Sequence, residues 1–398
     1  MAGSNFTFFE RKALMQIDFT KPAFFDVMRL TRGHTTSAYL ITLAALAQGL
    51  SVTFFRSQRD AGLKNPMFSD EVSEPIFYRI SNGRRAHFFN GTQSDRTSAT
   101  AAMATKDKLK TKALLHAKNL NTPLGGLMST QDHSLLGRMH QAGVKWFVIK
   151  PVAGSLGNGV FLHQSAKQVF QYLQANSKES FLIEQHISGF EHRVYVVDGL
   201  AVSAYQTVPN HVVGDGSQNL RKLFAARQHR RQYNPFQIDK PADMAVVEMA
   251  LLARGATLSD IPAAGQIVWL ANNAVPDSQS DFLSSLESLP ISAKRLAVDA
   301  SRAASANFAA LDMIVDRTGT AYVLEINIRA YIGAASFMIS NGAYNLTVPN
   351  ALIQSLFGPA KTGPRTILGF DFQALGAEVF REGRTSKGVE ATDFAQFG

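Results

Sequence analysis

Cysteine is missing from this chain of 398 residues. Its absence excludes disulfide bonds, thiolate metal sites and cysteine nucleophiles, and it is typical of proteins in a reducing compartment. No apolar run reaches the roughly 18 residues that a membrane-spanning helix needs, and the first residues lack the charged segment and apolar core of a secretory signal. The ten histidines include no pair at the spacing of zinc ligands. We therefore expect a cytoplasmic protein without a membrane partner.

Acidic residues are scarce relative to basic ones, because 31 Asp and Glu stand against 40 Lys and Arg and give a net charge of +9. Such an excess suits a nucleic-acid-binding protein, or an enzyme that holds polyphosphate and acidic substrates. The densest basic run lies between Arg221 and Arg231, and no aromatic residues alternate with its charges, as single-strand binding favours. A solvated helix face explains the run more simply, so we expect no nucleic-acid partner.

Two alternating apolar runs, joined by a tight turn at Thr318 and Gly319, predict a β-hairpin in the last third of the chain. In this register Asp312 lies directly across from Glu325, and Asn327 points to the same face as Glu325. Two carboxylates and an amide oxygen are the hard ligands that Mg²⁺ prefers when substrate phosphates complete its shell. A surface hairpin with solvated acids is the alternative, but apolar neighbours on both sides disfavour it.

A glycine-rich segment follows the strand predicted over residues 146–150. Gly154, Gly157 and Gly159 leave the backbone free to approach a polyanion. A second strand, not a helix, comes next, and the chain has no G-x-x-x-x-G-K sequence followed by Ser or Thr, so neither a dinucleotide-binding turn nor a P-loop is present. The segment is a candidate flap over a nucleotide, with Lys150 reaching the phosphates. A plain turn and a solvated lysine are the alternatives.

Further signals along the chain predict strands and loops. Strands are predicted over 160–162 and 181–184, and Asp198 and Gly199 predict a hairpin turn. Glycine, asparagine and proline signals predict long loops from Pro209 to Gly216 and from Ala271 to Pro276.

The order of these features resembles the ATP-grasp superfamily of carboxylate–amine ligases, and most closely the ATP-grasp parts of cyanophycin synthetase and of the bifunctional glutathione synthetases. The resemblance extends from about Gly33 to Leu356, and its most distinctive element is the Val-Gly-Asp-Gly run at 213–216. It implies the ATP-grasp fold, of the α/β (α+β) class. The domains that it implies are an N-terminal αβ domain over 22–105, a small lid subdomain over 106–187, a C-terminal subdomain with the metal site over 188–358, and a tail over 359–398.

Carried over position by position, the resemblance implies an ATP site. The residues assigned to ATP are Lys108, Lys150, Gly154, Ser155, Gly157, Gly159, Glu184, Gln185, Ile187 and Glu191. The two lysines would contact the phosphates, and the glycine segment would close as a flap. Glu184 and the residues after it would bind adenine, partly through backbone groups, and Glu191 would bind the ribose hydroxyls.

The resemblance also assigns Asp312, Glu325 and Asn327 to Mg²⁺, with Mn²⁺ as an alternative metal, and it draws attention to two arginines. Arg193 resembles an arginine that faces the phosphates or the acyl substrate in relatives, and a guanidinium suits either group. Arg329 stands where close relatives tend to carry small residues and proline. If the strand persists, Arg329 shares the face of Glu325 and Asn327 and would contact the carboxylate of an acidic or amino-acid substrate. An arginine that leaves the strand into solvent fits the sequence equally well.

The activity implied is the ATP-dependent joining of a small carboxylic acid to an amine, both amino-acid-like, through an acyl phosphate. The chain ends without the Mur-ligase-like half of cyanophycin synthetase, so we do not expect polymer synthesis by that two-site scheme. A homodimer is expected from the relatives. The alternatives are a kinase that stops at a phosphorylated product, a nucleotide-binding regulator without turnover and, more remotely, a nucleic-acid-binding protein.

Overall fold

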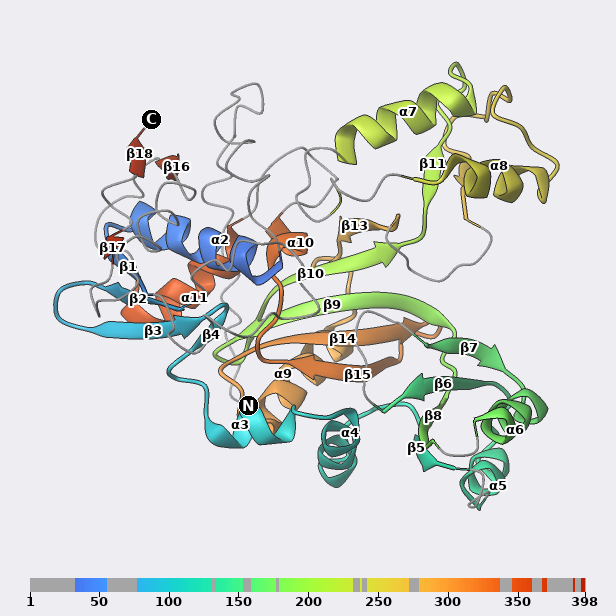
Figure 1. Cartoon of the computed structure of the whole chain (residues 1–398), viewed down its shortest axis with the longest axis horizontal. Coiled ribbons are helices and arrows are strands. Elements are labelled where there is room, and N and C mark those ends of the chain that lie inside the picture. Colours follow the sequence, from blue (N-terminus) through green and yellow to red (C-terminus); the bar gives the residue numbers. More distant parts are fainter. Residues whose placement is uncertain are drawn as a thin grey trace, which may run out of the picture.

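A computed structural model describes residues 33–55, 77–129, 134–152, 159–176, 179–231, 237, 242–271, 279–336 and 346–359, together with the backbone of 367–370, 389–390 and 395–397. Two sheets of five strands and one of four form the framework, helices pack on their faces, and every strand pair in these ranges is antiparallel (Figure 1). The predicted α/β (α+β) class is therefore confirmed. No helix in the described ranges is both long and apolar enough to cross a bilayer.

The central sheet has the strand order β13-β10-β9-β14-β15. Its strands are β9 (Gly189–Val197), β10 (Leu200–Val208), β13 (Asp281–Ser284), β14 (Phe308–Asp316) and β15 (Ala321–Asn327). Helix α9 (Ile291–Ala303) buries its alanines against one face of this sheet. The predicted turn at Asp198 and Gly199 is confirmed: both residues have positive φ, 44° and 77°, as a two-residue hairpin with a type I′ turn requires.

The N-terminal sheet covers part of the other face of the central sheet, through helices that lie between the two (Figure 1). Its strand order is β17-β1-β2-β3-β4. The strands are β1 (Ser51–Phe55), β2 (Phe77–Ser81), β3 (Ala86–Asn90), β4 (Gln93–Ser94) and β17 (Val389–Glu390). The helices are α2 (Gly33–Ala47), α10 (Gly333–Ser336) and α11 (Thr347–Phe357). From Ala38 to Ala47 helix α2 is apolar except for Thr42, and this part is buried between the layers.

The last residues contribute short strands that the sequence did not predict. β17 pairs with β1, so the tail completes the edge of the N-terminal sheet. β16 (Ile367–Phe370) pairs with β18 (Ala395–Phe397). The boundaries predicted for the domains stay predictions, but the tail does not stand apart from the N-terminal domain.

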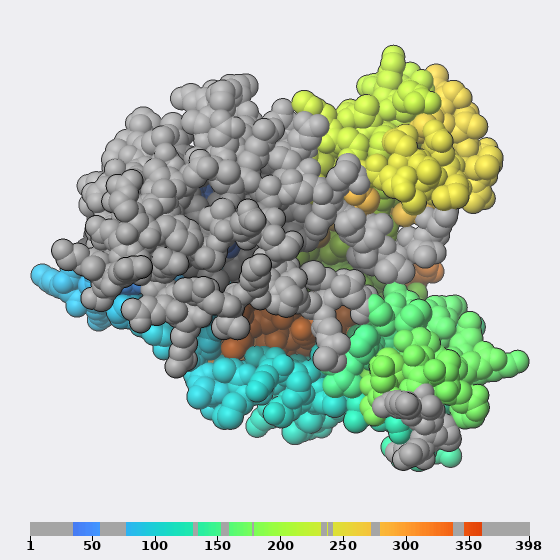
Figure 2. All heavy atoms as spheres, in the orientation of Figure 1, coloured from blue at the N-terminus to red at the C-terminus, as the bar shows by residue number. Residues whose placement is uncertain are grey.

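A smaller sheet with the order β5-β8-β6-β7 forms a separate lobe, shown in green in Figure 2. Its strands are β5 (Gly125–Met128), β6 (Phe147–Pro151), β7 (Phe161–Gln164) and β8 (Phe181–Gln185). The helices α5 (Ser134–Gln141) and α6 (Ala166–Ala175) pack on it. The helices α3 (Ala99–Ala104) and α4 (Lys108–Ala117) connect this lobe to the N-terminal sheet. The three strands predicted here lie within one residue of their predicted starts.

A second lobe, lime and yellow in Figure 2, is inserted between β10 and β13. It consists of β11 (His211–Val213), β12 (Ile267–Trp269), α7 (Leu220–Arg231) and α8 (Met244–Leu252). The prediction of one long loop from Pro209 to Gly216 was wrong, because β11 forms within it and pairs with β12. The second predicted loop, from Ala271 to Pro276, lies outside the described residues beyond its first position.

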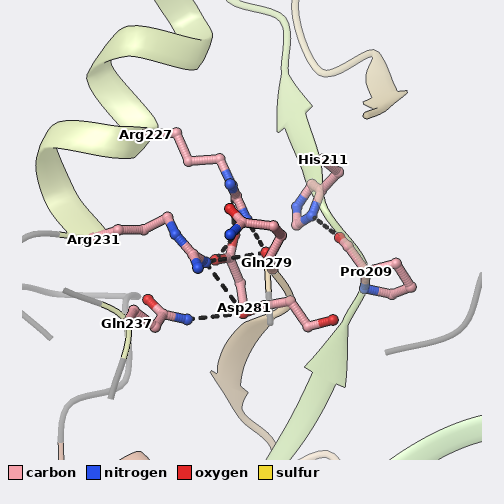
Figure 3. Close-up of polar contacts among 8 residues, drawn as sticks. Pro209, His211, Arg227, Arg231, Gln237, Gln279 and Asp281 are labelled. Carbon is pink, nitrogen blue, oxygen red and sulfur yellow. Dashed lines mark hydrogen bonds and ion pairs between the residues drawn. The ribbon is translucent and has the colours of Figure 1, made fainter. Parts of the chain in front are cut away.

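The basic run on α7 is only partly a solvated face. Arg227 and Arg231 are 2% and 1% exposed, and both donate to the carboxylate of Asp281 on β13 (Figure 3). Arg227 bridges both carboxylate oxygens, Nε to Oδ2 at 3.0 Å and Nη2 to Oδ1 at 2.9 Å. A buried charge is stable only when it is paired and hydrogen-bonded. This cluster therefore anchors α7 to the edge of the central sheet.

Candidate active site

The candidate site lies on the face of the central sheet opposite α9. Strand alternation sends Val194 and Leu311 into the core beneath α9, and it sends Arg193 and Asp312 to the opposite face. In the strand register Asp312 lies between Arg193 on β9 and Glu325 on β15. Three adjacent strands thus carry one row of charged side chains.

The predicted pairing of Asp312 with Glu325 is confirmed, but by a different route. The strands are joined by a three-residue loop closed by the Asp316 N–H donating to the Thr320 carbonyl at 2.9 Å, with Gly319 at a φ of 85°. That loop alone would place Asp312 opposite Leu324. A β-bulge after Asp312 shifts the register by one residue and restores the pair with Glu325.

Arg193 binds Asp312 through two parallel hydrogen bonds. Nε lies 2.6 Å from Oδ1, and Nη2 lies 2.7 Å from Oδ2. The amide of Asn327 donates to the same Oδ2 at 3.3 Å. Burial alone would lower the pKa of Arg193, but the Asp312 carboxylate more than offsets this and holds that pKa well above its usual value. Arg193 is therefore a permanent cation fixed beside the predicted metal ligands.

Two further carboxylates crowd this face. Burial, and then the negative charge of Asp312, raise the pKa of Glu325 and that of Glu191. Lys108, the first residue of α4, opposes the shift at Glu325 by its positive charge. Carboxyl groups crowded together in this way form a site that a cation would stabilise.

The donor set fits a hard divalent cation. Asp312, Glu325 and Asn327 offer carboxylate and amide oxygens, the ligands that Mg²⁺ and Mn²⁺ prefer. Among the described side chains no three His, Cys, Asp or Glu residues cluster closely enough to hold a metal. The predicted set has only two carboxylates, so its third ligand has to be the amide of Asn327 or a group of the substrate.

Across from this face, the small lobe presents Glu184 between two lysines. Lys150 Nζ lies 2.5 Å from Oε2 and Lys112 Nζ lies 2.7 Å from Oε1. Burial raises the pKa of Glu184, but the two ammonium groups outweigh burial and lower it below its usual value. Burial lowers the pKa of Lys112. Lys150 is thus part of an ion-pair network and not a solvated surface lysine.

Lys112 is the residue of this network that the sequence did not single out. It lies one helical turn after Lys108 on α4, and its ammonium group also donates to the carbonyl of Pro123 and to Thr122 Oγ1 at 3.4 Å. The spacing of four residues from Lys108 was the available signal.

The segment predicted to bind adenine links the two sheets, since Gln185 ends β8 and β9 begins at Gly189. The Gln185 N–H donates to the Leu124 carbonyl at 2.7 Å. Of the predicted flap, Gly154, Ser155 and Gly157 lie outside the described residues. Gly159 has a φ of 71°, and a Cβ there would lie 2.9 Å from Pro151 Cγ, so this position requires glycine.

A pocket of about 320 Å³ opens beside the charged row. It is lined by Gln93, Ala102, Thr105, Lys106, Ile326, Asn327, Ile328 and Arg329. The strand does not persist to Arg329, because β15 ends at Asn327 and the next two residues form a turn, so strand alternation does not place Arg329 on the face of Glu325. Arg329 nevertheless lines the same pocket as Asn327, as the interpretation of a substrate-facing arginine requires.

Comparison with known proteins identifies the fold. Residues 105–228 match the RimK-like ATP-grasp domain family. The chain is 25% identical over 251 residues to the glutathione biosynthesis bifunctional protein GshAB of Desulfotalea psychrophila, covering 59% of this chain and 31% of that protein. It is 26% identical over 217 residues to the cyanophycin synthetase of Trichormus variabilis, covering 51% and 23%. The chain thus spans about a third or less of the length of these relatives.

Among solved structures, a bifunctional glutathione synthetase from Pasteurella multocida superposes with a TM-score of 0.56, at 20% identity, over 71% of this chain and 40% of that one. These matches define the class of protein: the chain has the ATP-grasp fold, and its residues 105–228 are similar to the RimK-like ATP-grasp domain. The resemblance to cyanophycin synthetase and to bifunctional glutathione synthetases is confirmed.

Proposed function

We propose that this protein is an ATP-dependent carboxylate–amine ligase that forms an amide or peptide bond between two small, amino-acid-like substrates. One observation carries the proposal: two charged clusters occur together in an ATP-grasp fold. The first is the row Arg193–Asp312–Glu325 on the central sheet, and the second is the lysine–glutamate–lysine network on the small lobe. The relatives bear the names of synthetases or of biosynthetic proteins.

In this proposal ATP lies between the small lobe and the central sheet. Lys150 and Lys108 contact the phosphates, and Glu191 binds the ribose. Adenine lies against the segment from Glu184 to Ile187. The network around Glu184 supports this role, because a lysine whose partner is a buried carboxylate is held in one position before the nucleotide arrives.

Asp312, Glu325 and Asn327 would hold Mg²⁺ or Mn²⁺, which when bound would neutralise phosphate charge and orient the γ-phosphoryl group. Arg193 adds a fixed guanidinium next to these ligands, where negative charge develops during phosphoryl transfer. Its planar fork matches a phosphate or an acyl phosphate as well as it matches Asp312.

The reaction needs no catalytic base in its first step, because the substrate carboxylate is already a nucleophile. A carboxylate oxygen attacks the γ-phosphorus, the bond to the β-phosphate oxygen breaks, and ADP leaves. The amine then attacks the acyl carbon, phosphate leaves with the carbon–oxygen bonding pair, and the amine loses a proton. The chain's cations hold the reactants in line, which is the main requirement for such a transfer.

The test is a turnover assay with Mg-ATP and pooled amino acids and short peptides, with ADP, phosphate and product mass as readouts. The proposal predicts acid-dependent ADP release and a product whose mass equals two substrates minus water. Glu325→Gln should lower turnover by at least about 100-fold, while Asp299→Asn, an exposed acid on α9, should not. A stable phosphorylated product would indicate a kinase instead. ATP binding without turnover by any pair would favour a regulator. The homodimer and the cytoplasmic location stay predictions.

A further inference from the structure

The pocket beside the charged row has the size of a small metabolite. Its volume of about 320 Å³ leaves room for a molecule of amino-acid size. It opens where three parts of the fold meet: β4 supplies Gln93, the junction between α3 and α4 supplies Thr105 and Lys106, and the end of β15 supplies Asn327 and Arg329.

The lining of this pocket is positively charged. Lys106 and Arg329 are its charged residues, and none of its lining residues is acidic. Its neutral polar members, Gln93, Thr105 and Asn327, can each donate or accept a hydrogen bond. A pocket with two cations and several neutral polar groups favours an anionic ligand with further polar atoms.

Arg329 is presented from a fixed backbone although it lies beyond the end of the strand. The Ala330 carbonyl accepts from Thr92 Oγ1 at 2.9 Å, and the Tyr331 carbonyl accepts from the Tyr195 hydroxyl at 2.7 Å. The Ile332 N–H donates to Ser37 Oγ at 3.1 Å. Long-range hydrogen bonds at three consecutive residues hold this turn in place, so the backbone from which the Arg329 side chain extends is fixed.

Asn327 connects the pocket to the candidate catalytic row. Asn327 donates to Asp312 and also lines the pocket. A molecule in the pocket therefore lies next to the proposed site of phosphoryl transfer and within a lining that includes Arg329 and Lys106.

We propose that this pocket binds the acyl substrate and that Arg329 and Lys106 bind a second carboxylate, separate from the one that reacts. The acid that is activated is then a dicarboxylic acid of amino-acid size. This inference rests on the ligase function proposed above. A guanidinium binds a carboxylate through two parallel hydrogen bonds, whereas a neutral amide offers it one carbonyl oxygen and no opposite charge.

The first experiment compares acids in matched pairs: glutamate with glutamine, aspartate with asparagine, and succinate with succinamate. Each is supplied with Mg-ATP and a pool of amines, and ADP release gives kcat/KM. The wild type should prefer the dicarboxylate of its best pair by roughly 10- to 100-fold. Arg329→Gln should bring that ratio close to one, Lys106→Gln should lower it less, and Lys110→Gln, an exposed lysine outside the pocket, should leave it unchanged. Equal use of acid and amide by the wild type would overturn the proposal.

The second experiment measures binding without turnover, by calorimetric titration of the same acids into the full chain with Mg²⁺ and a non-hydrolysable ATP analogue. Dicarboxylates should bind the wild type and bind Arg329→Gln roughly 10- to 100-fold more weakly. If they do so but no acid is ever turned over, the pocket assignment stands and the ligase proposal fails. If acids are turned over without preference for a second carboxylate, the ligase stands and the pocket assignment fails. Binding of no dicarboxylate also overturns the assignment.

Discussion

Glu184 is the common partner of the two lysines in the ion-pair network of the small lobe. Its carboxylate is buried and accepts from Lys112 and Lys150 at once. Each charge-assisted contact of this kind contributes about 1.5–3 kcal/mol when its partner would otherwise be left buried. Lys150, which faces the proposed phosphate site, is thus held by the carboxylate of Glu184. That carboxylate is held in turn by a second lysine, Lys112.

Replacing that second lysine should therefore cost stability and nucleotide affinity together. We expect Lys112→Met to lower the free energy of unfolding by about 2 kcal/mol, because its 7% exposed ammonium group is one of two partners of Glu184. Urea titration measures the loss. Lys110→Met, whose side chain is 62% exposed two positions earlier, should change stability by less than about 0.5 kcal/mol. Equal effects of the two variants would contradict the role given to Lys112.

The side chain of His192, on the face of the central sheet opposite the charged row, predicts that the free energy of unfolding depends on pH. Burial lowers its pKa from 6.5 to about 4, and Nδ1 lies 3.0 Å from Ser285 Oγ. The fold therefore favours the neutral ring, so its contribution to stability is complete above pH 6.5 and is lost as the pH falls toward 4. Unfolding free energies measured across this window should fall more steeply for the wild type than for His192→Gln. Parallel curves would show that His192 does not titrate as described.

At the residue scale the sequence predicted which side chains share a face better than it predicted their contacts. Alternation along two strands was enough to align Asp312, Glu325 and Asn327, because side-chain direction in a strand has a period of two. The bidentate pair of Arg193 with Asp312 depends on how β9 pairs with β14, and the two strands are more than 100 residues apart along the chain. No local pattern encodes that pairing.

At the scale of elements, the inserted lobe explains the most distinctive run of the sequence. Gly214 lies so close to the loop at 262–264 that a Cβ would be 2.2 Å from the Ala263 carbonyl oxygen. Its N–H donates to the Gln266 carbonyl at 2.8 Å. Asp215 turns the chain by accepting from the N–H groups of Ser217 and Gln218 at 2.8 and 2.7 Å. The Val-Gly-Asp-Gly run is thus explained by packing of the lobe.

A methyl group at Gly214 should therefore destabilise the lobe. We expect Gly214→Ala to lower the free energy of unfolding by about 1–3 kcal/mol, because the contacting atom is backbone and has to shift. The matched control is Gly137→Ala on α5, where a Cβ meets nothing within 4 Å. That substitution should stabilise its helix by up to about 1 kcal/mol. Thermal and urea unfolding of both variants compare them, and a stable Gly214→Ala would contradict the close packing.

The attachment of α7 to β13 gives a second test at this scale. Asp281→Ala leaves two buried guanidinium groups without their shared carboxylate and should cost about 3–5 kcal/mol. Asp299→Ala removes an exposed partner of Arg302 on α9 and should cost less than about 1 kcal/mol. Proteolysis within residues 209–271 should be faster in Asp281→Ala alone. Unchanged stability there would mean that the cluster does not anchor the lobe.

Strands and turns could be predicted where they depend only on the periodicity and the turn residues of their own segment. The hairpin at Asp198 and Gly199 follows from residues that tolerate positive φ. The bulge in the hairpin of β14 and β15 and the pairing of β17 with β1 were not predicted. A bulge has no fixed composition, and a strand of two residues has too few positions for a pattern.

At the scale of the whole molecule, two lobes project from the central sheet (Figure 2), and the row of charges lies on the face of that sheet opposite α9. The small lobe carries the lysine network and the inserted lobe is tied to the sheet edge by Asp281. The order of motifs along the sequence was sufficient to predict the ATP-grasp fold. Those motifs do not identify the substrates, and the pocket that we propose for the acid is formed by segments from three parts of the chain.

The central claim is that a carboxylate is activated as an acyl phosphate. The most direct measurement uses the acid found in the turnover assay, with its carboxylates labelled with oxygen-18, and follows the label by mass spectrometry of the released phosphate. Acyl-phosphate formation predicts one labelled oxygen in each phosphate at every turnover, because the carboxylate oxygen that attacked phosphorus leaves with it. Unlabelled phosphate alongside amide product, or label in AMP, would contradict the account.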